Sequence, residues 1–254
     1  MIGKNVSLSA ASAVLNVMRR ELAGYFTTPV AWVFIVIFLV MSGVFTFYIG
    51  SFYERGIADL EPFFQFHAWL YLFLVPAIAM RLWAEERRSG TVELLLTLPL
   101  TTWQAVLGKF LAAWLFIGVA LLLTTPTWMT VNYLGQPDNG AIAAGYLGSW
   151  LMAGSFLAIG SCLSALTRNQ VVAFILSVVV CFGFLLSGLP MVMNLFSGWA
   201  SQAVLDMISG FSFLARFASI SKGVLDLRDL VYFGLVMGFW LLANTIVLEM
   251  KKAD

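Results

Sequence analysis

The residues that could perform chemistry in this chain of 254 residues are few and form no catalytic pattern. There is one histidine, His67, and the two cysteines, Cys162 and Cys181, both lie in apolar runs. The sequence contains no G-x-x-x-x-G-K-[ST], HExxH or G-x-S-x-G motif. We therefore expect no catalytic site and no metal site, and we expect the cysteines to be small buried side chains rather than a disulfide.

A proton relay through His67 is the remaining chemical possibility. The histidine stands beside Gln65 near the start of an apolar run, and a single histidine at such an interfacial position is usually only hydrogen-bonded. No acidic residue lies deep in any apolar run, although proton- or sodium-coupled carriers usually need one. We expect His67 to be dispensable. A proton-coupled secondary carrier and a membrane-embedded enzyme stay open as alternatives.

The most concentrated charges lie in the run Glu85–Arg88, and a glycine break follows at position 90. A threonine then caps a short apolar helix over Val92–Leu98, and Pro99 ends it. A solvated turn that holds the topology would need only the charges, whereas an apolar capped helix needs a partner surface. We expect the residues of this segment to bind a partner and not to be catalytic: Glu85, Glu86, Arg87, Arg88, Ser89, Gly90, Thr91 and Glu93.

The composition identifies the setting of these residues. Hydrophobic residues make up 61% of the chain, charged residues only 11%, and the mean hydropathy is +0.93. Soluble domains carry about a quarter charged residues, so the chain has too few charges for a soluble surface and is expected to be an integral membrane protein. A net charge of +1 gives no basic field that would favour nucleic acid.

Apolar stretches of about 20 residues can cross a bilayer as helices. We expect an all-α membrane protein with one permease domain, 1–254, and six spans, at residues 29–50, 63–83, 102–133, 141–166, 170–189 and 230–249. With both termini in the cytoplasm, ten lysines and arginines lie inside and four outside, as the positive-inside rule requires.

Several segments carry more local signals. The cytoplasmic segment 1–28 includes an amphipathic interfacial helix, Val14–Phe26, whose apolar face is expected to hold Val14, Leu15, Met18, Leu22, Tyr25 and Phe26. The aromatic-rich extracytoplasmic segment 190–229 is expected to form two short re-entrant helices, or else one helix on the outer surface.

Helix boundaries and helix contacts are also marked. Thr28–Pro29 indicates the start of the first span, Thr101–Gln104 fits a capping box, and Pro126 is expected to kink the third span. Small residues in the fourth span and the motif Gly234-x-x-x-Gly238 predict close helix packing, within one subunit or between two.

The chain resembles the permeases of ABC-2-type exporters over nearly its whole length. The resemblance begins at RRELAGYFTTPVAWVF (Arg19–Phe34) and is most specific at EERRSGTVELLLTLPLT (Glu85–Thr101), which is similar to the coupling helix of that family. The stretch FLARFASISKGVLDLRDLVYF (Phe213–Phe233) looks like the gliding-motility (GldF-like) and copper-site maturation (NosY-like) branch.

The resemblance implies a non-catalytic subunit that couples ATP hydrolysis elsewhere to export across the bacterial inner membrane. Its expected partners are two copies of an ATP-binding subunit, a second permease copy or a paralogue, membrane lipid and an extracytoplasmic accessory subunit, with no nucleic acid. ATP and magnesium would bind the ATP-binding subunit, and this chain would hold no cofactor. The resemblance does not name the cargo.

Overall fold

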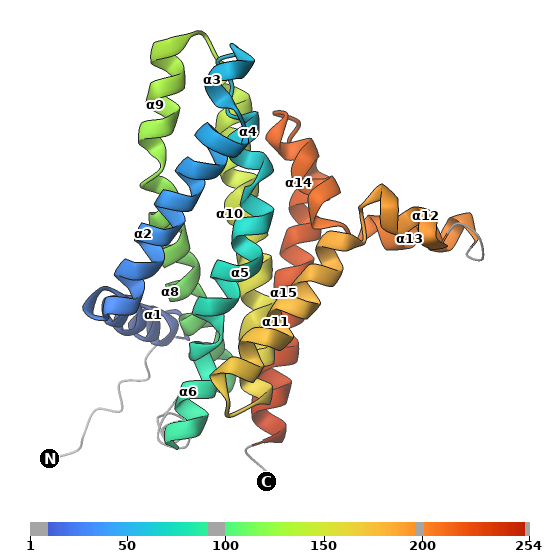
Figure 1. Ribbon diagram of the computed structural model, residues 1–254. Coiled ribbons are helices and arrows are strands. Elements are labelled where there is room, and N and C mark those ends of the chain that lie inside the picture. Colours follow the sequence, from blue (N-terminus) through green and yellow to red (C-terminus); the bar gives the residue numbers. More distant parts are fainter. Residues whose placement is uncertain (1–9, 91–99, 197–200, 252–254) are drawn as a thin grey trace, which may run out of the picture.

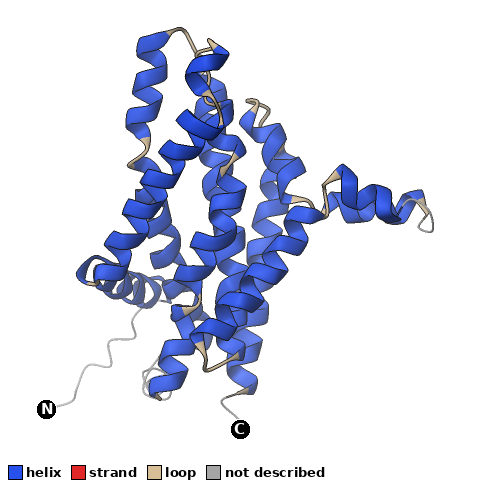
Figure 2. Cartoon of the chain, viewed as in Figure 1, coloured by secondary structure: helices blue, strands red, loops and turns tan. Residues whose placement is uncertain are grey.

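The computed structural model describes residues 10–90, 100–196 and 201–251, and all regular elements in this part of the chain are helices (Figures 1 and 2). The all-α class is therefore confirmed. In chain order the elements are α1 (Ala10–Thr27), α2 (Pro29–Gly43), the π-helix η1 (Val44–Ile49), α3 (Phe52–Arg55), α4 (Glu61–Gln65), α5 (His67–Ala79), α6 (Arg81–Ser89), α8 (Thr102–Leu122), α9 (Thr125–Leu134), α10 (Asn139–Leu166), α11 (Gln170–Leu186), α12 (Pro190–Phe196), α13 (Gln202–Gly210), α14 (Phe213–Ser221) and α15 (Leu227–Met250).

Five helical stretches of the described residues are long and apolar enough to cross a membrane: Ala31–Arg55, His67–Ser89, Thr102–Leu134, Asn139–Leu166 and Leu227–Met250. They agree with five of the six expected spans. The remaining one, α11, has 17 residues, which is about 26 Å of helix at 1.5 Å per residue. That length is at the short end for a bilayer core of about 30 Å, so the six-span topology stays a prediction.

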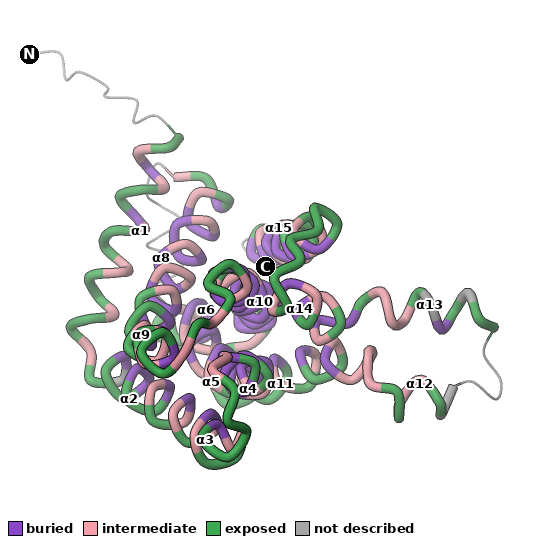
Figure 3. The backbone as a smooth tube through the Cα atoms, turned by 90° about the horizontal axis from the view of Figure 1, so that it is seen from above, coloured by how far each residue is buried: buried purple, intermediate pink, exposed green. Residues whose placement is uncertain are grey.

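Helix α10 occupies the middle of the bundle, surrounded by α5, α6, α8 and α15 (Figure 3). Its small residues allow the close approach that the sequence predicts. A Cβ atom added at Gly160 would lie 2.5 Å from the Cβ of Ala79, and one at Gly145 would lie 2.5 Å from the ring of Phe64. The small residues of the fourth span thus pack within one chain. By contrast, a Cβ at Gly234 or Gly238 would meet no described atom within 4 Å.

Three predicted helix boundaries can be compared with the structure. The Thr101–Gln104 capping box is present, with each side chain bonded to the backbone of the other residue. Pro29 lies in the first turn of α2, but the Thr28 hydroxyl donates to the carbonyl of Tyr25 instead of capping α2. The third span is interrupted between α8 and α9, and Pro126 lies in the first turn of α9. Proline has no N–H group and cannot continue the hydrogen bonds of the preceding helix.

Helix α1 lies across the lower end of the bundle in Figure 1, at the end where α15 also finishes. It packs on α8, and a Cβ at Gly108 would lie only 2.7 Å from the side chain of Val17. Its buried residues are Ala13 and Val17, whereas Leu15 and Phe26 are 39% and 36% exposed. Leu22 and Tyr25 of the expected apolar face also pack against the core, so that face meets α8 in part, and the interfacial position of the helix stays a prediction.

The described residues of the segment before α15 form three helices instead of the two expected. Helices α12 and α13 extend sideways from the bundle, whereas α14 returns to it (Figures 1 and 3). Phe213, Phe217 and Ile220 of α14 are buried, and α14 packs on α10. A re-entrant position in the outer leaflet stays a prediction.

Candidate coupling site

The charged run Glu85–Arg88 lies on α6, a helix that follows α5 directly. The expectation that this run lies in a loop is therefore corrected. Helices α5 and α6 are separated at Met80, and the side chain of Ser164 of α10 bonds to the backbone there. The Ser164 hydroxyl donates to the Met80 carbonyl at 2.9 Å and accepts from the N–H groups of Trp83 and Ala84 at 3.2 and 3.0 Å. These first N–H groups of a helix lack partners within it. A side chain of α10 therefore fixes the position and direction of α6.

The expected glycine break ends α6. Gly90 adopts a left-handed conformation, with φ of 73°, and its N–H bonds to the carbonyl of Glu86. Glycine adopts this conformation without the steric penalty of a Cβ. The Ser89 hydroxyl donates to the carbonyls of Glu85 and Glu86 at 3.0 and 3.2 Å. The last turn thus has a defined end at the point where the expected apolar helix would follow.

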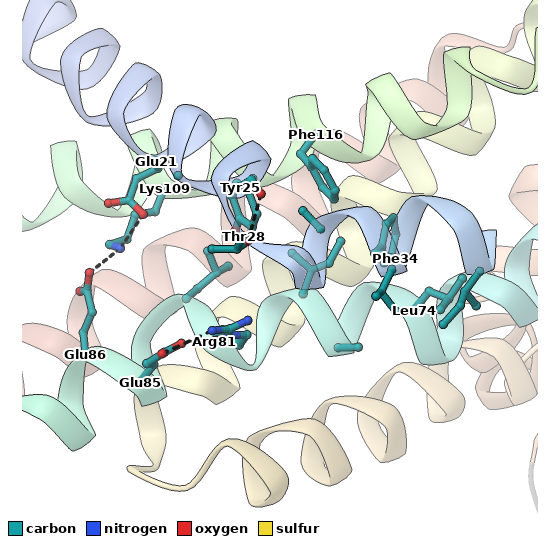
Figure 4. A pocket seen from close by; sticks show the side chains of 17 residues that line it. Glu21, Tyr25, Thr28, Phe34, Leu74, Arg81, Glu85, Glu86, Lys109 and Phe116 are labelled. Carbon is teal, nitrogen blue, oxygen red and sulfur yellow. Dashed lines mark hydrogen bonds and ion pairs between the residues drawn. The ribbon is translucent and has the colours of Figure 1, made fainter. Parts of the chain in front are cut away.

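A buried lysine of α8 joins α6 to α1 (Figure 4). The Lys109 Nζ atom lies 2.6 Å from Glu86 and 3.2 Å from Glu21, and the lysine side chain is 3% exposed. The ammonium group also lies 5.4 Å from the centre of the Trp83 ring. A buried cation is stable only when it is paired and hydrogen-bonded, so the two carboxylates and the lysine stabilise one another and connect three helices.

The sequence argument did not identify Glu21 and Lys109 as members of this site. The available signal was the lysine itself, which interrupts an apolar helix and therefore required a buried acidic partner. Nearby, burial and the negative charge of Glu21 both raise the pKa of the Tyr25 hydroxyl above its usual value, so this phenol is neutral at physiological pH. The ring of Tyr25 stacks on that of Phe116, which anchors the end of α1 to α8.

The predicted partner-binding residues that the structure describes fall into a partly buried group and an exposed group. Glu86 and Arg87 are partly buried and make contacts within the chain, Glu86 with Lys109 and Arg87 with the carbonyl of Ala165. The exposed residues of the segment are Glu85, Arg88, Ser89 and Gly90. Thr91, Glu93 and the predicted helix Val92–Leu98 lie outside the described residues.

His67 lies apart from this site. Its side chain is 0% exposed, and its expected position at the membrane interface stays a prediction. Its Nδ1 atom is 2.9 Å from the Ser149 hydroxyl, which is also 2.8 Å from the Tyr71 hydroxyl, and its ring packs against Phe63. The histidine is thus hydrogen-bonded within an aromatic cluster. Both cysteines are buried free thiols, as predicted.

Comparison with protein families now places the chain. The family described as "ABC-2 family transporter protein" matches residues 15–230, which include most of α1, the charged helix α6 and the buried Lys109. The chain belongs to this ABC-2 transporter family. A search of curated proteins finds no significant match.

Membership has direct consequences. An ABC-2 transporter protein of this kind is a multi-pass permease and a non-catalytic transmembrane subunit. Permeases of the family pair with ATP-binding subunits, and the family implies transport driven by ATP. Among the described residues no group of three or more histidine, cysteine, aspartate or glutamate side chains could hold a metal ion.

Proposed function

We propose that this chain is the membrane subunit of an ATP-driven exporter and that residues 85–99 dock on a separate ATP-binding subunit. The observation that carries the proposal is the Glu21–Lys109–Glu86 ion-pair cluster. It ties the charged helix α6 to α1 and α8 at one end of the bundle. A docking helix that is bonded to the transmembrane helices can transmit a displacement to them, whereas a passive loop cannot.

The exposed part of α6 supplies the docking charges. Glu85 and Arg88 are exposed, and charged rim residues guide and orient protein association. The buried part of α6 supplies the transmission. Movement of α6 would displace Lys109 of α8 through Glu86, and would displace α10 through the hydrogen bonds to Ser164.

The wider assembly follows from the same proposal. Two copies of the ATP-binding subunit would act on two permease chains, identical or paralogous, in the bacterial inner membrane with both termini in the cytoplasm. An extracytoplasmic accessory subunit belongs to the same proposal, as does membership of the gliding-motility (GldF-like) or NosY-like branch. ATP and magnesium would bind the ATP-binding subunit.

Two substitutions separate docking from transmission. Arg88→Glu reverses an exposed charge that forms no ion pair among the described residues, so it should weaken co-purification of the ATP-binding subunit with the tagged permease. The matched control is Arg228→Glu, an exposed arginine at the start of α15, the opposite end of the bundle. The same co-purification for both variants would show that α6 is not the docking surface.

Lys109→Met tests transmission. The lysine is 2% exposed and is not available to a partner. The ATP-binding subunit should therefore still co-purify, while ATP hydrolysis by the reconstituted complex becomes uncoupled from transport. Loss of co-purification in a folded Lys109→Met protein would mean that the cluster shapes the docking surface and does not transmit movement.

A further inference from the structure

A cavity of about 380 Å³ opens beside the ion-pair cluster, between α1, α2, α5, α6 and α8. The wall of the cavity is charged at one end and apolar at the other. Figure 4 shows Glu21, Glu85 and Arg81 near one end and Phe34, Leu74 and Phe116 near the other. The volume lies within the range of ligand pockets, about 300–1,000 Å³. A charged end joined to an apolar end fits an amphiphile.

We propose that this cavity binds the headgroup and the first part of one acyl chain of phosphatidylethanolamine, a zwitterionic membrane lipid with a primary amine. The proposal goes beyond the proposed function, because lipid binding requires neither the ATP-binding subunit nor a cargo.

The charges of the lining residues favour this headgroup. Three carboxylates, of Glu21, Glu85 and Glu86, face two cations, of Arg81 and Lys109, which leaves one net negative charge. An anionic headgroup would add a second unbalanced negative charge. A zwitterion instead offers a phosphate to a cation and an ammonium group to a carboxylate.

The Arg81–Glu85 pair is the accessible part of this set. The two side chains are 34% and 47% exposed and lie 2.9 Å apart. Exposed ion pairs contribute little stability in water, so an incoming zwitterion can separate this pair and give each partner a new one. The phosphate would then accept from Arg81 and the ammonium group would donate to Glu85. Lys109, at 3% exposure, keeps its own carboxylate partners.

The apolar end indicates a lipid and not a soluble molecule with the same headgroup. Phe34 and Ile37 of α2 and Leu74 of α5 line this end, and both helices belong to stretches that can cross a membrane. Glu21 at the charged end belongs to α1, and Thr28, which also lines the cavity, lies where the chain passes from α1 into α2. Headgroups and acyl chains meet at such a boundary.

Gly24 offers a position for a side chain at the cavity. It lines the cavity, and a Cβ built on it would meet no described atom within 4 Å. We expect the larger side chain of Gly24→Phe to obstruct the cavity in a folded protein. Gly183→Phe is the matched control, because Gly183 lies in α11, away from the cavity, and is equally open.

The experiment is native mass spectrometry of the full purified chain in detergent, titrated with phosphatidylethanolamine or phosphatidylglycerol of identical acyl chains. We expect phosphatidylethanolamine to bind about tenfold more tightly, which corresponds to roughly 1.4 kcal/mol. Gly24→Phe should abolish the preference and Gly183→Phe should keep it. Glu85→Gln, an exposed substitution, should reduce the preference and leave bound lipid otherwise unchanged.

Three results would overturn the proposal. Equal binding of the two lipids by the unmodified chain would remove the headgroup assignment. An unchanged preference in a folded Gly24→Phe protein would place the lipid elsewhere. If Gly24→Phe does not fold, an unchanged preference in Glu85→Gln would lead to the same conclusion. Displacement of the lipid by glycerophosphoethanolamine, which has no acyl chains, at similar concentrations would indicate a soluble ligand.

Discussion

Replacing Lys109 by methionine should destabilise the chain strongly. The lysine side chain is 3% exposed and the side chains of Glu21 and Glu86 are each 22% exposed. Methionine keeps most of the side-chain volume but leaves two carboxylates without their cation. Removing one partner from a buried ion pair typically costs about 3–5 kcal/mol. Because both glutamates retain some contact with water, we expect a loss near the lower limit, about 3 kcal/mol.

The assay is thermal unfolding of the purified chain in detergent, followed by the loss of helical circular dichroism. For a chain of this length, each kcal/mol corresponds to about 2–4 °C in Tm, so Lys109→Met should lower Tm by about 6–12 °C. The control is Arg81→Met. It removes the cation of an exposed pair, worth at most about 1 kcal/mol, and should lower Tm by less than about 4 °C.

The carboxylates provide the decisive comparison. If their uncompensated charge causes the loss, adding Glu21→Gln and Glu86→Gln to Lys109→Met should restore much of the stability, because neutral amides need no cation. Equal destabilisation in the single and triple variants would refute this reasoning and would assign the effect to packing. A Tm that does not change in Lys109→Met would show that the cluster is not an important contact of the folded chain.

Three further outcomes can be checked. Gly160→Ala should lower stability by about 1–3 kcal/mol through overpacking, whereas Gly183→Ala, which meets open space, should not, as thermal unfolding would show. His67→Gln should retain ATP-dependent transport, and its loss in a folded, assembled protein would indicate a proton relay. In intact cells, an impermeant thiol reagent should label a cysteine at Tyr133 of α9 but not one at Arg20 of α1, since the two helices lie toward opposite ends of the bundle (Figure 1). Both native cysteines are buried, and the reverse labelling pattern would invert the topology.

Features that depend on neighbouring residues could be predicted from the sequence. The Thr101–Gln104 capping box requires only residues three positions apart, and the left-handed Gly90 only the lack of a Cβ. The close packing of α10 also followed from its small residues, because glycine in a membrane helix has few uses other than close approach. These signals are local, and the structure reproduces them.

Features that depend on distant residues could not be predicted. A helical wheel assigns α1 an apolar face but does not show which neighbour covers it, and Val17 is buried against Gly108 of α8. Glu21 and Lys109 are far apart in the sequence, so no spacing rule connects them. The burial of His67 depends on a distant partner in the same way, because its Nδ1 atom lies 2.9 Å from the hydroxyl of Ser149 in α10, and no spacing rule connects the two residues.

Buried polar side chains of α6, α10 and α15 form a connected set. The indole N–H of Trp83 in α6 and the amide of Asn244 in α15 both donate to the Ser161 hydroxyl of α10, at 3.2 and 2.8 Å. A hydroxyl oxygen has two lone pairs, so it can accept both. Because these groups are buried, leaving one without its partner is costly. A displacement of α6 therefore moves α10 and α15 with it or breaks these bonds. In the first case, a movement that starts at the proposed docking charges reaches the centre of the bundle.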